Sequence, residues 1–409
     1  MKSIATKTIQ TLALGSGLIL FNACGGGGSG GGGGSGTTPT PTPQELATQV
    51  IDDCSQPYVV LGQSGTLVNR NDHIDYIITC SLNIWGDLSI APDVKIEFGS
   101  GAGLNIDGGS LQAKGTAVKP IVLTGQDKTA GSWKGLFFRS SDVKNELDYV
   151  QIDYAGGGSF NSNGDEGSVI VYSNTLLKMT NSTLQHSKTY GLNASYGGND
   201  LTLENNTITT SEAPMYLGPQ YVTTITGGTY TGNTRDAIIL NSDRIDNDST
   251  WKDLGVPYHV ESRLVVIAGG GHLTIEPGVT IEFAANADLS IVEGASGSKP
   301  SLVAIGTAAK PITFTGIDKV KGAWKGIYID SPHPRNEIAF ANINYASNPA
   351  QEGAIYTWYG TVLNVHDVTF NHIQRDAIHI KKSLTALPTV TATNNTFNDI
   401  DGADNITTN

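Results

Sequence analysis

The two stretches that decide the fold are Leu88-Ser-Ile-Ala-Pro-Asp-Val-Lys-Ile-Glu-Phe98 and Leu273-Thr-Ile-Glu-Pro-Gly-Val-Thr-Ile-Glu-Phe283. In each, apolar residues alternate with polar ones on both sides of a Pro-Asp or Pro-Gly turn, which is typical of two short β-strands. The second stretch matches the first almost position by position. The chain therefore contains one module twice.

The duplication continues well beyond these stretches. Segments in the same order and register match as three pairs: 113–125 with 304–316, 131–135 with 322–326, and 145–155 with 336–346. We call residues 88–155 the first repeat and residues 273–346 the second repeat. A duplication of this length predicts two tandem copies of a long module, at about residues 58–250 and 251–409.

A finer period runs inside the first copy. Similar strand-like segments begin at Leu177, Leu201 and Val222, at spacings of 24 and 21 residues. A period in this range indicates one coil of chain per repeat, and each coil buries its apolar residues by stacking on the next. From Tyr58 onward, short apolar or β-branched runs alternate with Gly, Asn, Asp and Ser, so we expect an all-β domain.

One helix is expected, just before the first strands. Thr42 is a suitable N-cap, Pro43 occupies the first helical position, and Leu46, Val50 and Cys54 fall on one helical face. This pattern predicts a short amphipathic helix that covers the open first coil.

The repeated motifs resemble those of bacterial surface lipoproteins built from right-handed parallel β-helix repeats. They are Leu-x-Ile-x-Pro-Gly/Asp-Val-x-Ile-x-Phe, Ala-x-Gly-Thr-Ala-x-Lys-Pro-Ile-x-x-Thr-Gly and Gly-x-Trp-Lys-Gly, and the resemblance covers about residues 74–409. It implies an all-β fold, a right-handed parallel β-helix or solenoid over residues 44–409. Proteins of this fold include polysaccharide-degrading enzymes, adhesins and other surface proteins, so the resemblance implies no single function.

The first residues indicate export. Lys2 and Lys7 precede an apolar core over residues 12–21, which is too short to span a bilayer, as in a secretion signal. The end of the leader, residues 20–24, resembles a lipobox, which implies cleavage after residue 23 and acylation of Cys24. We expect a lipid-anchored protein of the bacterial outer membrane, facing the periplasm or the cell surface, whose contact with the membrane is through the lipid anchor only.

A spacer follows the predicted anchor. Over residues 24–43 a Gly/Ser tract precedes alternating Thr and Pro, which is a flexible segment followed by a stiffer one. With Cys24 acylated, Cys54 and Cys80 remain as an even pair in an oxidising compartment, and we predict a disulfide between them. The net charge of −13 and the lack of a basic stripe argue against nucleic acid as a partner.

Two kinds of binding site are considered. Trp133 and Trp324 are candidates for stacking on a ligand, although packing against the coil edge is the preferred interpretation. Two clusters of oxygen-bearing side chains suit Ca²⁺, which takes six to eight oxygen ligands. They are Asp243, Asp246 and Asp248 between the copies, and Asn161, Asn163 and Asp165 in an insertion that the second copy lacks. Neither cluster has a full calcium-loop pattern, so no cofactor is the main expectation.

No catalytic residues are predicted. His186 recurs as His372, and Arg235-Asp236 recurs as Arg375-Asp376, whereas an active site is normally built once per domain. The recurrence favours strand-end histidines and turn-stabilising Arg-Asp pairs. We therefore expect a non-enzymatic binding module of the cell envelope or surface, with polysaccharide or another envelope or extracellular macromolecule as partner. The alternative is a carbohydrate-active enzyme, a polysaccharide lyase or hydrolase, on the same fold.

Overall fold

A computed structural model describes residues 46–409, apart from positions 61, 71–72, 268–270, 294–296, 298, 359 and 383–386. The chain divides into two units, Met1–Gln44 and Glu45–Asn409, and every described element belongs to the second. The predicted signal peptide, the acylated Cys24 and the spacer lie outside the described residues.

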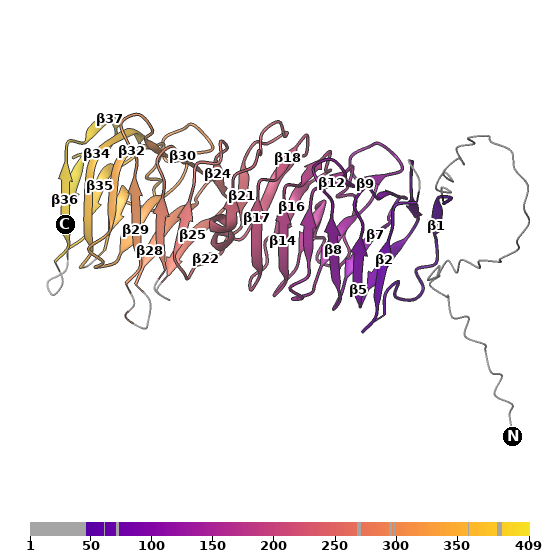
Figure 1. The fold of residues 1–409 in the computed structure, drawn as a ribbon. Coiled ribbons are helices and arrows are strands. Elements are labelled where there is room, and N and C mark those ends of the chain that lie inside the picture. The colour runs from indigo at the N-terminus through magenta and orange to yellow at the C-terminus, as the bar shows by residue number, and fades with distance from the viewer. Residues whose placement is uncertain are drawn as a thin grey trace, which may run out of the picture. The chain divides into compact units, whose positions relative to one another are not determined.

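The second unit is almost entirely β, and its strands pair in parallel. Strands from successive coils lie side by side along the unit from β1 to β37 (Figure 1). Sheet I is seven-stranded and contains, in order, β1 (Gln49–Ile51), β3 (Tyr76–Ile78), β6 (Lys95–Phe98), β9 (Ile121–Gly125), β12 (Val150–Asp153), β15 (Thr183–Gln185) and β18 (Thr207–Thr209). All-parallel sheets of stacked short strands are consistent with a parallel β-helix or solenoid.

Two further sheets are also seven-stranded. Sheet II contains β2 (Ser64–Leu67), β5 (Asp87–Ile90), β8 (Ser110–Lys114), β11 (Glu146–Asp148), β14 (Leu176–Thr180), β17 (Asp200–Glu204) and β20 (Ile225–Thr226). Sheet III contains β22 (Arg244–Ile245), β25 (Arg263–Ile267), β28 (Asp288–Val292), β31 (Gly326–Asp330), β33 (Gly353–Thr357), β35 (Asp376–Ile380) and β38 (Ile406–Thr408).

The remaining strands form two ladders that meet in the extended strands β32 (Glu337–Asn344) and β34 (Val362–Ile373). The long ladder contains β4 (Ser81–Ile84), β7 (Gly103–Ile106), β10 (Gly135–Phe138), β13 (Val169–Val171), β16 (Tyr190–Ala194), β19 (Ala213–Leu217), β21 (Ile238–Leu240), β24 (Tyr258–Val260), β27 (Thr280–Phe283), β30 (Ile312–Gly316) and β37 (Thr396–Ile400). The short ladder contains β23 (Ser249–Trp251), β26 (His272–Ile275), β29 (Ser301–Ile305) and β36 (Thr389–Thr393).

The core follows from the alternation seen in the sequence. In β6, Ile96 and Phe98 are fully buried while Lys95 and Glu97 are not. The same alternation recurs in β27, where Ile281 and Phe283 are buried. Because strands pair in register from coil to coil, inward side chains stack into one continuous apolar core, and outward ones form columns on the surface.

The second repeat is turned by one sheet relative to the first. Strand β6 lies in sheet I, whereas its sequence counterpart β27 lies in the long ladder that carries β7 and β10. The long ladder passes from β21 through β24 to β27 without a break. A single 3-10 helix, η1 (Pro219–Thr224), lies before this junction. Surfaces with related sequences in the two repeats therefore lie on different sheets.

The predicted N-terminal helix is wrong over its described residues. Residues 49–51 form β1, which pairs with β3 as the first strand of sheet I, and Ile51 is the residue it buries. Leu46 and Val50 are exposed. The spacing of four that indicated a helical face is also an even spacing, which places residues on one side of a strand. The β-branched pair Val50-Ile51 then favours the strand.

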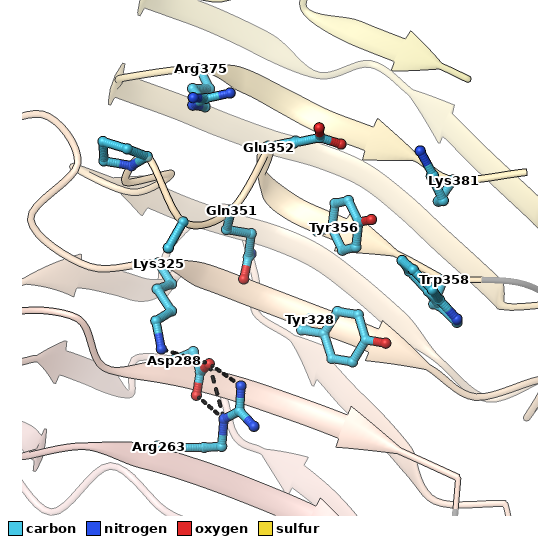
Figure 2. A pocket seen from close by; sticks show the side chains of 12 residues that line it. Arg263, Asp288, Lys325, Tyr328, Gln351, Glu352, Tyr356, Trp358, Arg375 and Lys381 are labelled. Atoms are coloured by element: carbon cyan, nitrogen blue, oxygen red, sulfur yellow. Dashed lines mark hydrogen bonds and ion pairs between the residues drawn. The ribbon is translucent and has the colours of Figure 1, made fainter.

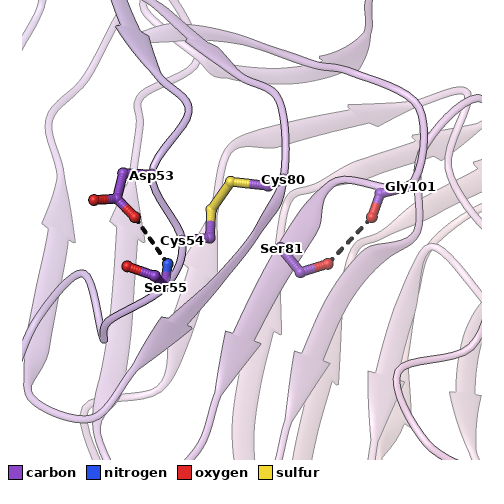
Figure 3. The surroundings of a disulfide bond; sticks show 6 residues. All are labelled: Asp53, Cys54, Ser55, Cys80, Ser81 and Gly101. Atoms are coloured by element: carbon purple, nitrogen blue, oxygen red, sulfur yellow. Dashed lines mark hydrogen bonds between the residues drawn. A yellow bond between two sulfur atoms is a disulfide. The ribbon is translucent and has the colours of Figure 1, made fainter.

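Cys54 and Cys80 form the predicted disulfide, with their Cα atoms 6.2 Å apart (Figure 3). It joins the segment after β1 to the residue before β4, so it ties the first coil to the next. Within the described part of the chain, no helix has the length and apolar character needed to cross a bilayer.

Candidate functional site

A groove of about 700 Å³ lies on the outer face of sheet III. Strands β25, β28, β31, β33 and β35 contribute to it, together with the loop that precedes β33. Its lining residues are Arg263, Asp288, Lys325, Tyr328, Pro349, Ala350, Gln351, Glu352, Tyr356, Trp358, Arg375 and Lys381. Aromatic rings occupy the middle, and charged groups lie at both ends (Figure 2).

Three rings form the floor of the groove, which we call the aromatic floor: Tyr328, Tyr356 and Trp358. Tyr328 pairs in register with Tyr356 on the next coil, and their rings stack with centroids 5.8 Å apart. Trp358 follows β33, and its ring lies 6.0 Å from that of Tyr356. These residues alternate with buried ones along their strands, so the sheet holds the rings outward at the spacing of the coils. Each ring is only partly exposed.

An ion cluster closes one end of the groove. The guanidinium of Arg263 donates two hydrogen bonds from Nε, at 3.0 and 3.1 Å, and one from Nη2, at 3.0 Å, to the carboxylate of Asp288. Lys325 Nζ lies 3.5 Å from the same carboxylate. The Asp288 side chain is only 1% exposed, whereas those of Arg263 and Lys325 are 58% and 27% exposed. The cluster therefore presents cations to the solvent above a buried anion.

The other end combines one engaged carboxylate with two cations. Glu352 Oε2 lies 3.0 Å from Nε2 of His379, whose Nδ1 lies 3.0 Å from Oδ2 of Asp376. The His379 side chain is 4% exposed, and of these three residues only Glu352 lines the groove. Arg375 and Lys381 line the same end and make no ion pair or side-chain hydrogen bond with any described residue.

Tyr328, the tyrosine closest to the ion cluster, also lies near the carboxyl group of Asp330. Burial, followed by the negative charge of the nearby Asp330 carboxylate, raises the pKa of the Tyr328 hydroxyl. Burial and the negative charge of Glu293 raise the pKa of Asp330. Hydrogen bonding to Asp288 raises the pKa of Arg263. Tyr328 and Arg263 therefore keep their protons at neutral pH and act as hydrogen-bond donors.

The structure does not support ligand stacking by Trp133 and Trp324. Both side chains are fully buried. Trp133 stacks on Phe98 and donates from Nε1 to the Asp153 carbonyl at 2.8 Å. Trp324 stacks on Phe283 and donates to the Asn344 carbonyl at 2.9 Å. Each ring therefore packs in the core between neighbouring coils.

In both calcium candidates, side-chain oxygens already contact other groups of the protein. Across the described ranges, no three His, Cys, Asp or Glu side chains lie close enough together to hold a metal ion. Asp243, Asp246 and Asp248 line a shallow hollow, but Arg244 Nε donates to Asp246 at 2.9 Å. In the insertion the contacts are internal: Asn161 donates to Asp165 at 2.6 Å, while Asn163 donates to Tyr196, which donates to Asp165.

The recurring charged residues have different surroundings. His186 and His372 lie at strand ends, as predicted; His186 stacks on Tyr154 and His372 on Tyr345. The Arg-Asp prediction is wrong, since no ion pair joins Arg235 to Asp236 or Arg375 to Asp376, all of which are described. Asp236 accepts hydrogen bonds from the turn at Gly232 and Asn233, and Asp376 contacts His379. Arg375 remains available to the groove.

Sequence analysis missed the aromatic floor and the cations beside it. A usable signal was present in the strand after each Gly-x-Trp-Lys-Gly motif, where Phe137 and Tyr328 occupy an outward position. What the sequence could not show was which of the two rings is covered by other residues.

Comparison with protein-family models, with curated proteins and with solved structures gives no match to this chain. The groove itself is therefore the basis for assigning a function.

Proposed function

We propose that this protein is an exported, lipid-anchored, right-handed parallel β-helix of two tandem copies that binds polysaccharide in the groove on sheet III without cleaving it. A pyranose ring has one face rich in C–H bonds and an edge of hydroxyl groups. The aromatic floor suits the face, and the charged ends of the groove suit the edge.

The aromatic floor in an open groove is the observation that carries the proposal. Tyr328, Tyr356 and Trp358 are held outward by three positions of a rigid sheet, so little conformational freedom is lost on binding. The groove is lined by residues from several successive coils of sheet III, which suits a polymer that lies across more than one coil. Small-molecule pockets, in contrast, enclose most of the ligand surface.

Export and anchoring rest on the sequence. The basic and apolar leader and the lipobox-like residues before Cys24 support an acylated N-terminus. The Cys54–Cys80 disulfide is typical of an oxidising compartment such as the periplasm or cell surface. We place the anchor in the bacterial outer membrane, with the Gly/Ser and Thr/Pro spacer setting the reach of the binding unit. No metal cofactor is part of the proposal.

The test is a glycan array on the soluble unit from residue 45 onward, followed by calorimetry on each polymer that binds. We expect Tyr328→Ala and Tyr356→Ala to weaken binding about 10-fold or more, because each removes a ring from the aromatic floor. Trp85→Ala is the matched control, since Trp85 is 43% exposed on a different sheet edge. Unchanged binding in both tyrosine variants would exclude the groove as the binding site.

The alternative is a carbohydrate-active enzyme, and Asp330 is the observation that favours it. A carboxyl whose pKa is raised by burial beside a sugar platform has the property of a general acid. Against it, the two carboxylates that line the groove, Asp288 and Glu352, are already paired with cationic or imidazole groups. Reducing-end and unsaturated-uronate assays on bound polymers separate the functions: turnover that Asp330→Asn abolishes would establish the enzyme.

A further inference from the structure

In the first repeat, a side chain of the protein itself covers the surface that corresponds to the groove. Phe137 of β10 is the sequence counterpart of Tyr328, and Lys134 is the counterpart of Lys325. The ring of Phe160, from the loop after the first repeat, lies nearly parallel to Phe137, with centroids 5.3 Å apart and an angle of 11°. Lys134 Nζ lies 5.2 Å from the centroid of the Phe160 ring. A ring supplied by the chain is thus held between an aromatic face and a cation.

The backbone beneath Phe160 makes room for it. A Cβ atom at Gly103 would lie 2.5 Å from Cζ of Phe160, so a side chain at this position is incompatible with the observed ring. With Phe160 in place, Phe137 is only 1% exposed. The first repeat therefore has the same aromatic position as the second, but with an apolar side chain of the protein lying on it.

The second repeat lacks this cover. The loop in the matching place, residues 347–351, is Ser-Asn-Pro-Ala-Gln and contains no aromatic residue, and it is shorter than the loop that carries Phe160. Tyr328 stacks only on Tyr356 of its own sheet among the described rings, and it is partly exposed. Phe160 fills the space over Phe137. The corresponding space over Tyr328 is part of the groove.

The residues that differ between the two surfaces indicate what kind of ring would bind over Tyr328. Where the first repeat has Gly103 next to the edge of Phe160, the second has Asp288, bonded to Arg263 and close to Lys325. An apolar ring edge over this cluster would cover the remaining N–H groups of Arg263 and Lys325 without offering them an acceptor, which is costly. A ring with a polar edge satisfies them. A sugar therefore fits the second surface as a phenyl ring fits the first.

The charge of the groove selects among sugars. Four cations line it, Arg263, Lys325, Arg375 and Lys381, against the carboxylates of Asp288 and Glu352. Both carboxylates are engaged, while Arg375 and Lys381 pair with no described group. This is a local excess of positive charge on a chain whose net charge is −13. Such an excess attracts an anionic ligand.

We propose that the groove binds an acidic polysaccharide built from uronic acids, with one pyranose ring lying over Tyr328 as Phe160 lies over Phe137, and with carboxylates of the chain bound by Arg375 and Lys381. The inference rests on the proposed polysaccharide binding and specifies its ligand. It assigns Phe160 the role of an internal substitute that keeps the related surface of the first repeat closed.

The preference for an anionic ligand is tested with polygalacturonate and its fully methyl-esterified form. These two polymers have the same rings and differ in charge. We expect polygalacturonate to bind at least about 10-fold more tightly in calorimetry, and Arg375→Gln and Lys381→Gln each to weaken it by about 10-fold, as for the loss of a charge-assisted hydrogen bond. Lys310→Gln is the matched control, because Lys310 is 66% exposed and lies outside the groove. We expect less than about a 2-fold change there, because the only ion pair of Lys310 among the described residues is an exposed one with Asp253, and exposed pairs contribute little.

The proposed position of the sugar ring over Tyr328 is tested by grafting the loop that carries Phe160 onto the second repeat. We would replace residues 347–351 with the sequence of residues 156–165, once with its phenylalanine and once with alanine in that place. Because both grafts replace the groove-lining residues 349–351, they are compared with each other: the phenylalanine graft should bind polygalacturonate at least about 10-fold more weakly than the alanine graft, with both melting as one cooperative unit. Binding retained by the phenylalanine graft would overturn the proposed ring position.

The outcomes separate this inference from the function it rests on. Equal affinity for the charged and esterified polymers, with no effect of Arg375→Gln, would overturn the acidic ligand and leave polysaccharide binding intact. Binding of neither polymer, together with no hit on a glycan array, would overturn both. Tighter binding of the charged polymer that Arg375→Gln and Lys381→Gln leave unchanged would place the anion site elsewhere and overturn the inference alone.

Discussion

Trp133 lies flat on Phe98, with ring centroids 4.0 Å apart and an angle of 6° between the planes. The counterpart pair, Trp324 and Phe283, has centroids 4.0 Å apart and an angle of 4°. Both indoles are fully buried and both donate to a carbonyl of the following coil. The two pairs are therefore equivalent packing units that join one coil to the next.

Replacing either tryptophan by alanine should be costly. We expect Trp133→Ala and Trp324→Ala each to lower the free energy of unfolding by about 3–5 kcal/mol, because a large buried ring is lost and a cavity remains. Urea titration followed by circular dichroism measures this. Trp85→Ala, at a 43% exposed tryptophan, is the control and should change stability by less than about 1 kcal/mol. Similar effects for buried and exposed sites would contradict the packing role.

The disulfide should stabilise the first coils. The double variant Cys54→Ser/Cys80→Ser should unfold at lower urea, with a loss of about 3 kcal/mol, because the bond closes a loop with a sequence separation of 26. Reduction of the wild-type protein should produce a similar loss, while the same reductant should leave the double variant unchanged. Two alkylatable thiols in protein isolated without reductant would show that the bond is absent from the exported protein.

Stability should depend on pH through His366. Hydrogen bonds to Asp367, 2.7 Å from Nδ1, and to Glu337, 3.0 Å from Nε2, raise its pKa above the ordinary 6.5. A raised folded-state pKa stabilises the protein fully below pH 6.5 and loses that contribution as pH rises through the folded-state value. The wild-type advantage over His366→Gln should shrink across that window in pH-dependent denaturation. An advantage that grows with pH would contradict the assigned ion pairs.

Calcium should leave the protein unchanged. The candidate carboxylates are engaged, as in the pair of Arg244 with Asp246 and in the bond from Asn161 to Asp165, and a calcium ion requires six to eight oxygen ligands. We expect the melting temperature to be the same in millimolar Ca²⁺ and in EDTA. A rise of several degrees that Asp165→Asn or Asp246→Asn removes would instead identify a bound ion, since a ligand of the native state stabilises it.

The anchor prediction concerns residues outside the described part. Cys24→Ser should move the protein from the membrane fraction to the periplasm or medium, because acylation requires the cysteine and stable attachment takes more than one acyl chain. Fractionation and immunoblotting of cells expressing each form measure this. A second variant, Cys54→Ser/Cys80→Ser, should remain with the membrane. A Cys24→Ser protein that stays membrane-bound would contradict lipid anchoring.

Much of the fold was predictable because its information is local and repeated. Alternation in segments such as 95–98 predicts short strands with one buried face, and the recurring periods predict stacking of coils. The disulfide was predictable from the count of cysteines. The strand at Gln49–Ile51 was not, because the spacing of four between Leu46, Val50 and Cys54 fits both a helix and a strand. Pairing with β3 decides between them, and pairing is a tertiary contact.

The candidate site shows the limit of such local information. The alignment of the two repeats makes Phe137 and Tyr328 counterparts and shows that the loop after the first repeat is longer. Only the tertiary structure decided that Phe160 covers one ring while the other floors a groove. It also brought Arg263, Arg375 and Lys381 to that groove from positions far apart in the chain. The stacking of successive coils decides how close these side chains lie. The amino-acid sequence therefore encodes their arrangement only through the packing of all the coils that separate them.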